Sequence, residues 1–168
     1  SVANHLNDIS KIDSELVVNT LKKWKETKKS NDINYIITHS TRTLVKLWDK
    51  QTLKFLWYSN KPKIKIQNFD IKNKIVNIWE SVKFGFDILW NKKENLIIDY
   101  KIYFIWKNEK LLPKVFKIKK LRFIKNINIS KKHPLKIMTT KKLFPWIHYI
   151  EIQINWVCFW KKEFELKY

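Results

Sequence analysis

Several residue types are nearly missing from this chain of 168 residues, and each shortage excludes a class of site. Cys158 is the one cysteine, so an internal disulfide and a cysteine-based metal cluster are excluded. Gly85 is the one glycine, which excludes the glycine-rich loops that bring backbone amides to a phosphate. The same shortage excludes a GXXG clamp of the KH type.

Acidic residues are also scarce relative to basic ones. Lys and Arg together number 35 and Asp and Glu 15, which leaves a formal charge of +20 at pH 7. A field of this size destabilises an isolated compact state, so it indicates a polyanionic partner: RNA, DNA or an anionic membrane surface. Arg42 and Arg122 are the only arginines. Lysine acts as a point charge on phosphate, so the chain favours backbone neutralisation over base reading.

Genome composition offers a second explanation of the lysines. The chain is crowded with Ile and Asn and contains little Gly or Ala, which is typical of a very AT-rich genome. Tryptophan nevertheless occurs nine times, although its standard codon is comparatively GC-rich. A genetic code that also reads UGA as tryptophan, as is common in mitochondria, would remove this contradiction.

The rest of the composition predicts one folded domain over residues 1–168. The chain is 45% hydrophobic and 15% aromatic, and a chain of this length buries roughly 70% of its unfolded surface. No internal repeat or linker divides it. The run 143–160 is the one candidate membrane span, but Glu151, Gln153 and Asn155 would lie near its centre, so membrane insertion is not expected.

The stretch 146–160 alternates at period two and predicts one long strand. Its apolar face carries Ile150, Ile152, Ile154 and Trp156, which we expect to line the core. The same face carries Cys158, expected as a small core residue, and His148, expected as a hydrogen-bonded one. Polar residues occupy the middle of the reverse face.

Two helices are predicted. Asp13 caps a helix over 14–28, in which Val17, Leu21 and Trp24 share a face. A second helix over 75–86 follows from a 3.6-residue apolar period, with Gly85 near its end. Strands are predicted at 33–38, 53–58, 61–66, 96–106, 114–129 and 135–140, while 41–48 is ambiguous. The fold class is therefore α+β, with two helices in the N-terminal half and a mainly antiparallel β-sheet in the C-terminal half.

No catalytic arrangement is visible in the sequence. The four histidines lack zinc-ligand spacing, and Asp87, Glu94 and Asp99 resemble ordinary surface acids. We therefore expect no enzyme, no cofactor, no metal and no small-molecule substrate. The expected RNA-binding residues are the basic side chains of the first helix and of the basic strands and loops: Lys22, Lys23, Lys25, Lys28, Lys29, Lys63, Lys65, Lys117, Lys119, Lys120, Arg122, Lys125, Lys131, Lys132, Lys136, Lys141 and Lys142.

The segment 133–163 resembles the closing part of the third small-subunit ribosomal protein family. Pro134 and Leu135 match its proline-leucine pair, 152–159 its last strand, and 161–163 its charged tail. The fourth small-subunit family is a rival, because Pro145 and 149–151 match its Pro-hydrophobic-Glu strand.

The resemblance implies a structural, rRNA-binding component of the mitochondrial ribosome, encoded in the mitochondrion and located in the matrix. Its partners would be rRNA and neighbouring ribosomal proteins. The alternative is a matrix-side accessory subunit of a respiratory complex, in which the lysines need not cluster.

Overall fold

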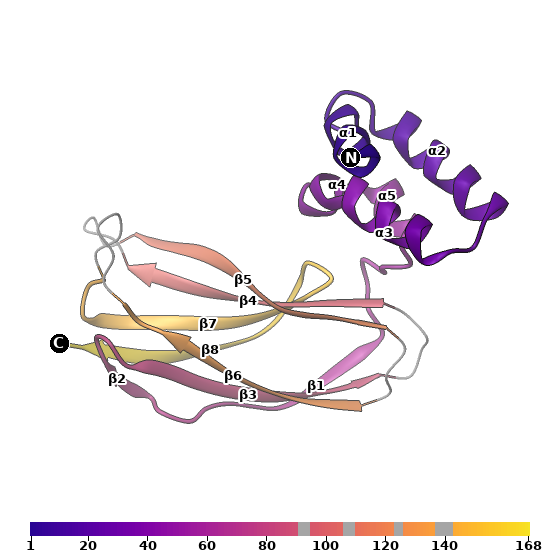
Figure 1. The fold of residues 1–168 in the computed structure, drawn as a ribbon. Coiled ribbons are helices and arrows are strands. Elements are labelled where there is room, and N and C mark those ends of the chain that lie inside the picture. The colour runs from indigo at the N-terminus through magenta and orange to yellow at the C-terminus, as the bar shows by residue number, and fades with distance from the viewer. Residues whose placement is uncertain (91–94, 106–109, 123–125, 137–142) are drawn as a thin grey trace. The chain divides into compact units, whose positions relative to one another are not determined.

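A computed structural model of the chain describes residues 1–90, 95–105, 110–122, 126–136 and 143–168, and its contacts divide the chain into two compact units. The first unit, 1–59, contains the helices, and the second, 60–168, contains the strands (Figure 1). Whether the two units behave as the single domain expected from the sequence stays a prediction. None of the described helices is long and apolar enough to cross a membrane.

The helical unit has five helices: α1 Val2–Ile9, α2 Ser14–Thr27, α3 Asn31–Ser40, α4 Arg42–Lys46 and α5 Lys50–Phe55. The helix expected at 14–28 is confirmed as α2, with Asp13 accepting a hydrogen bond from the Leu16 amide at 2.9 Å. Val17 and Leu21 of α2 are buried with Ile37 of α3, and Trp24 packs against them. The apolar face of α2 is thus the centre of this unit.

Two segments of the helical unit were expected to be strands. The predictions at 33–38 and 53–58 are wrong, because 33–38 lies in α3 and 53–55 in α5. Each helix begins at a side-chain cap: the Ser30 hydroxyl accepts from the Ile33 amide, and the Asp49 carboxylate accepts from the Thr52 amide. A cap satisfies an amide that the first helical turn leaves unpaired, so these two residues start helices despite the β-branched residues that follow.

The described residues of the second unit form eight strands: β1 Ile64–Ile71, β2 Ile75–Asn77, β3 Ser81–Trp90, β4 Asn95–Ile105, β5 Leu111–Arg122, β6 Asn126–Pro134, β7 Trp146–Ile154 and β8 Val157–Lys167. They form a three-stranded sheet in the order β1-β3-β6 and a five-stranded sheet in the order β2-β8-β7-β4-β5. All neighbours are antiparallel except β2 and β8, which are parallel.

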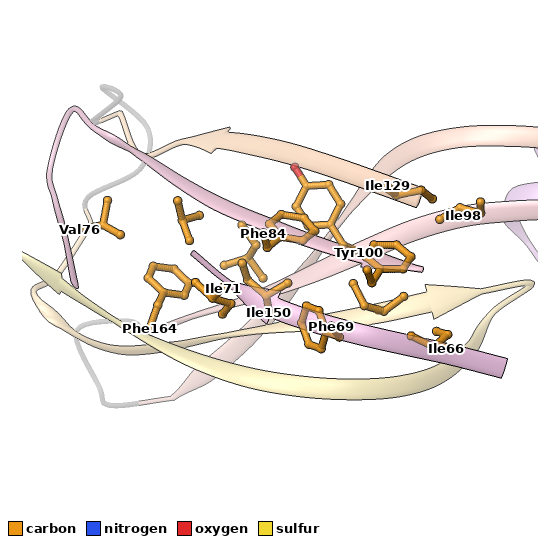
Figure 2. Packing of buried hydrophobic residues seen from close by; sticks show 14 of the residues in the cluster. Ile66, Phe69, Ile71, Val76, Phe84, Ile98, Tyr100, Ile129, Ile150 and Phe164 are labelled. Atoms are coloured by element: carbon orange, nitrogen blue, oxygen red, sulfur yellow. The ribbon is translucent and has the colours of Figure 1, made fainter. Parts of the chain in front are cut away.

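The two sheets share one hydrophobic core. Figure 2 shows Phe84 and Ile71 of the smaller sheet meeting Tyr100 and Ile150 of the larger one. Strand β4 lies between β5 and β7, and Leu96, Ile98, Tyr100, Ile102 and Phe104 all point inward from it. Inward residues at every second position are typical of a strand. The strand predicted at 96–106 is confirmed as β4, which spans Asn95–Ile105.

The predicted fold class is wrong in three respects. The described residues of the chain form five helices and not two, two sheets and not one, and two strands of different sheets where the second helix was expected. Residues 75–77 form β2, and 81–86 lie in β3, where Val82, Phe84 and Phe86 are buried. Apolar residues at 78, 82 and 86 fit the helical period. Because β3 pairs with both β1 and β6, its backbone hydrogen-bonding groups find partners on both sides, and the segment forms a strand.

The long strand expected at 146–160 is a hairpin. Strand β7 ends at Ile154, a turn occupies Asn155 and Trp156, and β8 returns beside β7. Ile150, Ile152 and Ile154 line the core as expected, but Trp156 lies in the turn and Cys158 is exposed. The polar reverse face is not solvated throughout, because Gln153 and Asn155 are buried.

Two buried polar residues fix the ends of β7. The Asn155 side chain accepts from the Ile97 amide at 2.8 Å and donates to the Asn95 carbonyl, so it ties the hairpin to β4. The imidazole of His148 lies 3.0 Å from the Phe144 carbonyl, which confirms the expected hydrogen-bonded core histidine. The predicted strand at 135–140 falls mostly outside the described residues.

We predict that Ile152→Asp unfolds the second unit. The side chain is fully buried between the sheets, so an unpaired carboxylate there should cost several kcal/mol. The control is Glu163→Gln, an isosteric change at an exposed position on β8. Chemical denaturation followed by tryptophan fluorescence should show a large loss for Ile152→Asp alone. A similar small effect from both variants would contradict the assignment of Ile152 to the core.

Candidate nucleic-acid interface

Strands β5 and β6 are edge strands of different sheets, and they meet where Phe116 of β5 contacts His133 of β6. The rings of Phe116 on β5 and His133 on β6 lie 4.4 Å apart, centroid to centroid. The Tyr100 hydroxyl, which belongs to β4, lies 2.7 Å from Nδ1 of His133. These three rings form one contact cluster that joins β4, β5 and β6 at this point.

Lysines follow both edge strands. Lys114 and Lys119 pair with the inward residues Ile102 and Ile98, so they extend from the edge beside the core, and Lys131 does the same opposite Phe84. Lys114 Nζ lies 5.6 Å from the centre of the Phe116 ring. We call this side the β5–β6 edge and define it by Lys114, Lys117, Lys119, Lys120, Lys131 and Lys132, of which only Lys131 is half-buried and the others are exposed.

Negative charge is almost missing from this region. The segment 110–150 contains no Asp and no Glu. Asp99 of β4 lies opposite Lys117 and is also influenced by Lys120. Its burial raises the pKa of the Asp99 carboxyl to about 6, although the two lysines lower it. The β5–β6 edge is therefore strongly positive.

The other long side of the sandwich is different. There, Lys162 of β8 forms an ion pair of 2.9 Å with Asp70 of β1, and its Nζ lies 5.8 Å from the Phe69 ring. The ion pair holds the pKa of the Asp70 carboxyl below its usual value. On this side the carboxylate of Asp70 offsets the charge of Lys162, so an anion would meet less positive potential here than at the β5–β6 edge.

The outer face of the five-stranded sheet carries an internally paired network. Lys101 Nζ lies 3.7 Å from the Glu151 carboxylate and donates to Cys158 Sγ at 2.9 Å, and the Tyr103 hydroxyl donates to Glu151. Lys161 Nζ lies 4.1 Å from the Tyr103 ring and 4.5 Å from the Tyr149 ring. Because these cations already have partners, we assign this face a structural role.

The sequence-predicted residues belong to both units, and within the second unit the structure does not gather all of them on one surface. Lys22, Lys23, Lys25, Lys28 and Lys29 belong to the helical unit, where Lys25 lies over the Phe55 ring at 5.1 Å. Lys63 precedes β1, Lys65 faces outward from β1, and Lys136 follows β6. Arg122 ends β5, and Lys125, Lys141 and Lys142 lie outside the described residues. The β5–β6 edge joins Lys117, Lys119, Lys120, Lys131 and Lys132.

Sequence reasoning missed two members of this region. The sequence predicts only the start of a strand at Lys114 and an ordinary surface acid at Asp99. The lack of acids between residues 110 and 150 was the available signal for Lys114. Within the described ranges, no cluster of three or more His, Cys, Asp or Glu side chains could hold a metal ion.

Comparison with known proteins gives the family. Residues 65–168, which contain nearly the whole sandwich, match the family described as "Uncharacterised protein YhaZ, C-terminal Ig-like domain". This chain belongs to that family. The protein YhaZ of Bacillus subtilis is 35% identical over 157 residues, which cover 92% of this chain and 43% of that protein.

A solved structure resembles the whole chain. The alkylpurine DNA glycosylase AlkC of Pseudomonas fluorescens, bound to DNA containing an abasic site analog, matches 99% of this chain and 47% of its own length, with 27% identity and a TM-score of 0.76. A β-glucosidase from Listeria innocua matches 62% of the chain with 11% identity and a TM-score of 0.48. This YhaZ-family chain spans less than half of the length of YhaZ and of AlkC.

These findings correct the functional expectations from the sequence. The ribosomal resemblance is wrong, because the family is that of YhaZ, and the last strand expected at 152–159 is interrupted by the turn between β7 and β8. The mitochondrial ribosome, the respiratory complex and the matrix location are wrong, because the relative is a bacterial protein. The expected rRNA and ribosomal partners, and the expectation of a non-enzymatic protein, are contradicted by the likeness to AlkC, which is a DNA glycosylase whose structure was solved with DNA.

We predict that Asp99→Asn stabilises the fold at pH 7. The folded pKa of about 6 lies above the unfolded value, so the folded state loses stability as pH rises from roughly 4 to 6. Removing the carboxylate should recover about 1 kcal/mol at pH 7, after allowance for solvent screening, and nothing below pH 4. Urea denaturation at both pH values measures this.

Asp87→Asn is the matched control, because hydrogen bonds from Asn68 and Asn128 lower the pKa of the Asp87 carboxyl. That variant should lose stability at pH 7, and the loss should fade as pH falls through the lowered pKa. Stabilisation by Asp99→Asn that persists at pH 3 would contradict the ionisation argument.

Proposed function

We propose that this chain is the DNA-binding C-terminal part of a protein that acts on alkylated bases in DNA, and that the β5–β6 edge contacts the DNA backbone. The observation that carries the proposal is the likeness to AlkC along 99% of the chain, at 27% identity and in a DNA-bound structure. The net charge of +20 and the basic β5–β6 edge agree with a polyanionic ligand of this kind.

The chemistry of the basic residues favours contact with phosphates over reading of bases. The β5–β6 edge consists of lysines, whose ammonium groups suit phosphate neutralisation, whereas bidentate recognition of guanine uses arginine. Recognition of a damaged base would then depend on other parts of the protein, and this chain would supply affinity and register.

Lysine on an edge strand has another role, which is to prevent pairing with a strand of another molecule. That role needs few lysines, and it predicts no preference for one side of the sandwich. Here the lysines lie on two edge strands held together by the contact between Phe116 and His133, while the β1–β8 side is closed by the pair of Lys162 and Asp70. This asymmetry supports a ligand at the β5–β6 edge.

We predict that the chain binds duplex DNA with a steep salt dependence and little sequence preference. Replacing Lys117, Lys119 and Lys120 together by Gln should weaken binding and reduce the log-log salt slope by about 3, or roughly 0.9 for each lost phosphate contact. Fluorescence anisotropy with a labelled duplex at several salt concentrations measures both quantities.

The matched control is the triple replacement of Lys72, Lys74 and Lys167 by Gln, which removes the same charge from other exposed positions. It should change the slope far less. Equal losses from the two triple variants would show that only net charge matters, and a flat salt response of the unchanged chain would refute DNA-backbone binding. Circular dichroism of both variants checks that the fold is kept.

A further inference from the structure

Six described residues other than glycine have a positive φ: Trp48, Trp57, Asn68, Trp79, Asn155 and Trp156. Asparagine tolerates this left-handed conformation, but for a bulky residue it is a true outlier, since its Cβ approaches the following carbonyl oxygen. The four positive-φ positions that are not asparagine are all tryptophan. Gly85, the one glycine, has no positive φ and lies within β3.

Two of these tryptophans end helices. After α4, the Trp48 amide donates to the Val45 carbonyl and the Asp49 amide donates to the Leu44 carbonyl, while Trp48 has a φ of 61°. This pair of bonds defines a Schellman motif, and Trp48 occupies its C′ position, which is usually glycine.

The end of α5 repeats the arrangement. The Trp57 amide donates to the Lys54 carbonyl, the Tyr58 amide donates to the Leu53 carbonyl, and the φ of Trp57 is 63°. Trp57 is thus at the C′ position of a second Schellman motif. Its side chain is 66% exposed, so core packing does not explain the choice of residue.

The other two tryptophans lie in β-turns. The Glu80 amide donates to the Asn77 carbonyl, and Trp79, the third residue of this turn, has a φ of 78°. A type II turn requires a φ near +80° at its third residue, which is a glycine position. Between β7 and β8, Asn155 and Trp156 have φ values of 45° and 67°, as a two-residue type I′ turn requires. Asn-Gly is the preferred pair in that turn.

The composition points to the same residue. A chain of this length ordinarily contains roughly 12 glycines, at about 7%. This chain has one glycine and nine tryptophans. A shortage of glycine and an excess of tryptophan have one common cause if a codon that specifies glycine in the source cell is read as tryptophan.

From these observations we infer that positions 48, 57, 79 and 156 are glycine in the protein as its own cell makes it, specified by UGA codons that this cell reads as glycine. Some genetic codes read UGA as tryptophan. Translating the gene with such a code writes tryptophan wherever this cell inserts glycine at UGA. The four turns then have their usual residue, and the strain of four left-handed tryptophans disappears.

The inference also changes which residues face a ligand. Trp48, Trp57 and Trp79 are 50%, 66% and 64% exposed, and exposed indoles would otherwise be candidates for stacking on nucleic-acid bases. With glycine at these positions no such stacking occurs there. The inference rests on backbone geometry and composition, so it stands independently of the proposed DNA binding.

The gene and the native protein test the inference directly. The four codons should be UGA, and peptides of the protein isolated from its own cells should have the masses expected for glycine at these positions. UGG codons, or peptide masses that correspond to tryptophan, would overturn it.

A folding experiment supplies an independent test. Two full-length variants are compared, one with Trp48, Trp57, Trp79 and Trp156 all replaced by Gly and one with all four replaced by Ala. Both lose the indoles, but alanine keeps the Cβ that disfavours positive φ. The glycine variant should have the larger folding equilibrium constant, by roughly five-fold for each position.

Trp24→Gly is the control for tryptophan that belongs to the fold, because Trp24 lies inside α2 and packs against the helical core. It should destabilise the helical unit. A glycine variant that is no more stable than the alanine variant would overturn the assignment of these four positions to glycine.

Discussion

The packing of β4 against the three-stranded sheet is the interaction on which the second unit depends. Five alternate residues of this strand, from Leu96 to Phe104, point into the shared core, while its backbone pairs with β5 on one side and β7 on the other. Since burial of such apolar area is the main favourable term in folding, the sheets must stack in the register that covers this face. The edge strands are positioned as a consequence.

The same packing determines where charge collects. The sandwich has two long sides, and its inward residues are apolar, so charged side chains are confined to outer faces and edges. On the β1–β8 side, and on the outer face of the five-stranded sheet, acids pair with the lysines. On the β5–β6 side the chain provides no acid between 110 and 150, so positive charge is in excess there. A surface that carries lysine along both edges is suited to a phosphate backbone and not to one specific base.

Both units of the molecule contain turns in which one residue has a left-handed backbone. Helices α4 and α5 end in Schellman motifs, and the connections from β2 to β3 and from β7 to β8 are tight turns with positive φ. Each needs a residue whose backbone enters the left-handed region without strain. Glycine at these four positions gives these four turns their preferred residue, whereas tryptophan would place a bulky outlier in each of them.

The sequence alone determined α2, with its Asp13 cap, and the strand at 96–106, because a cap and a long run that is apolar on both sides are local signals. It also determined the excess of positive charge. The tertiary structure decided that 75–86 forms strands and that 146–160 forms a hairpin, and both errors have one cause. Tryptophan at 79 and 156 hid two turns that glycine would have marked, so an apolar period appeared to continue through each. Only the pairing of β3 with β1 and β6, and of β7 with β8, satisfies those backbones and fixes where each strand ends.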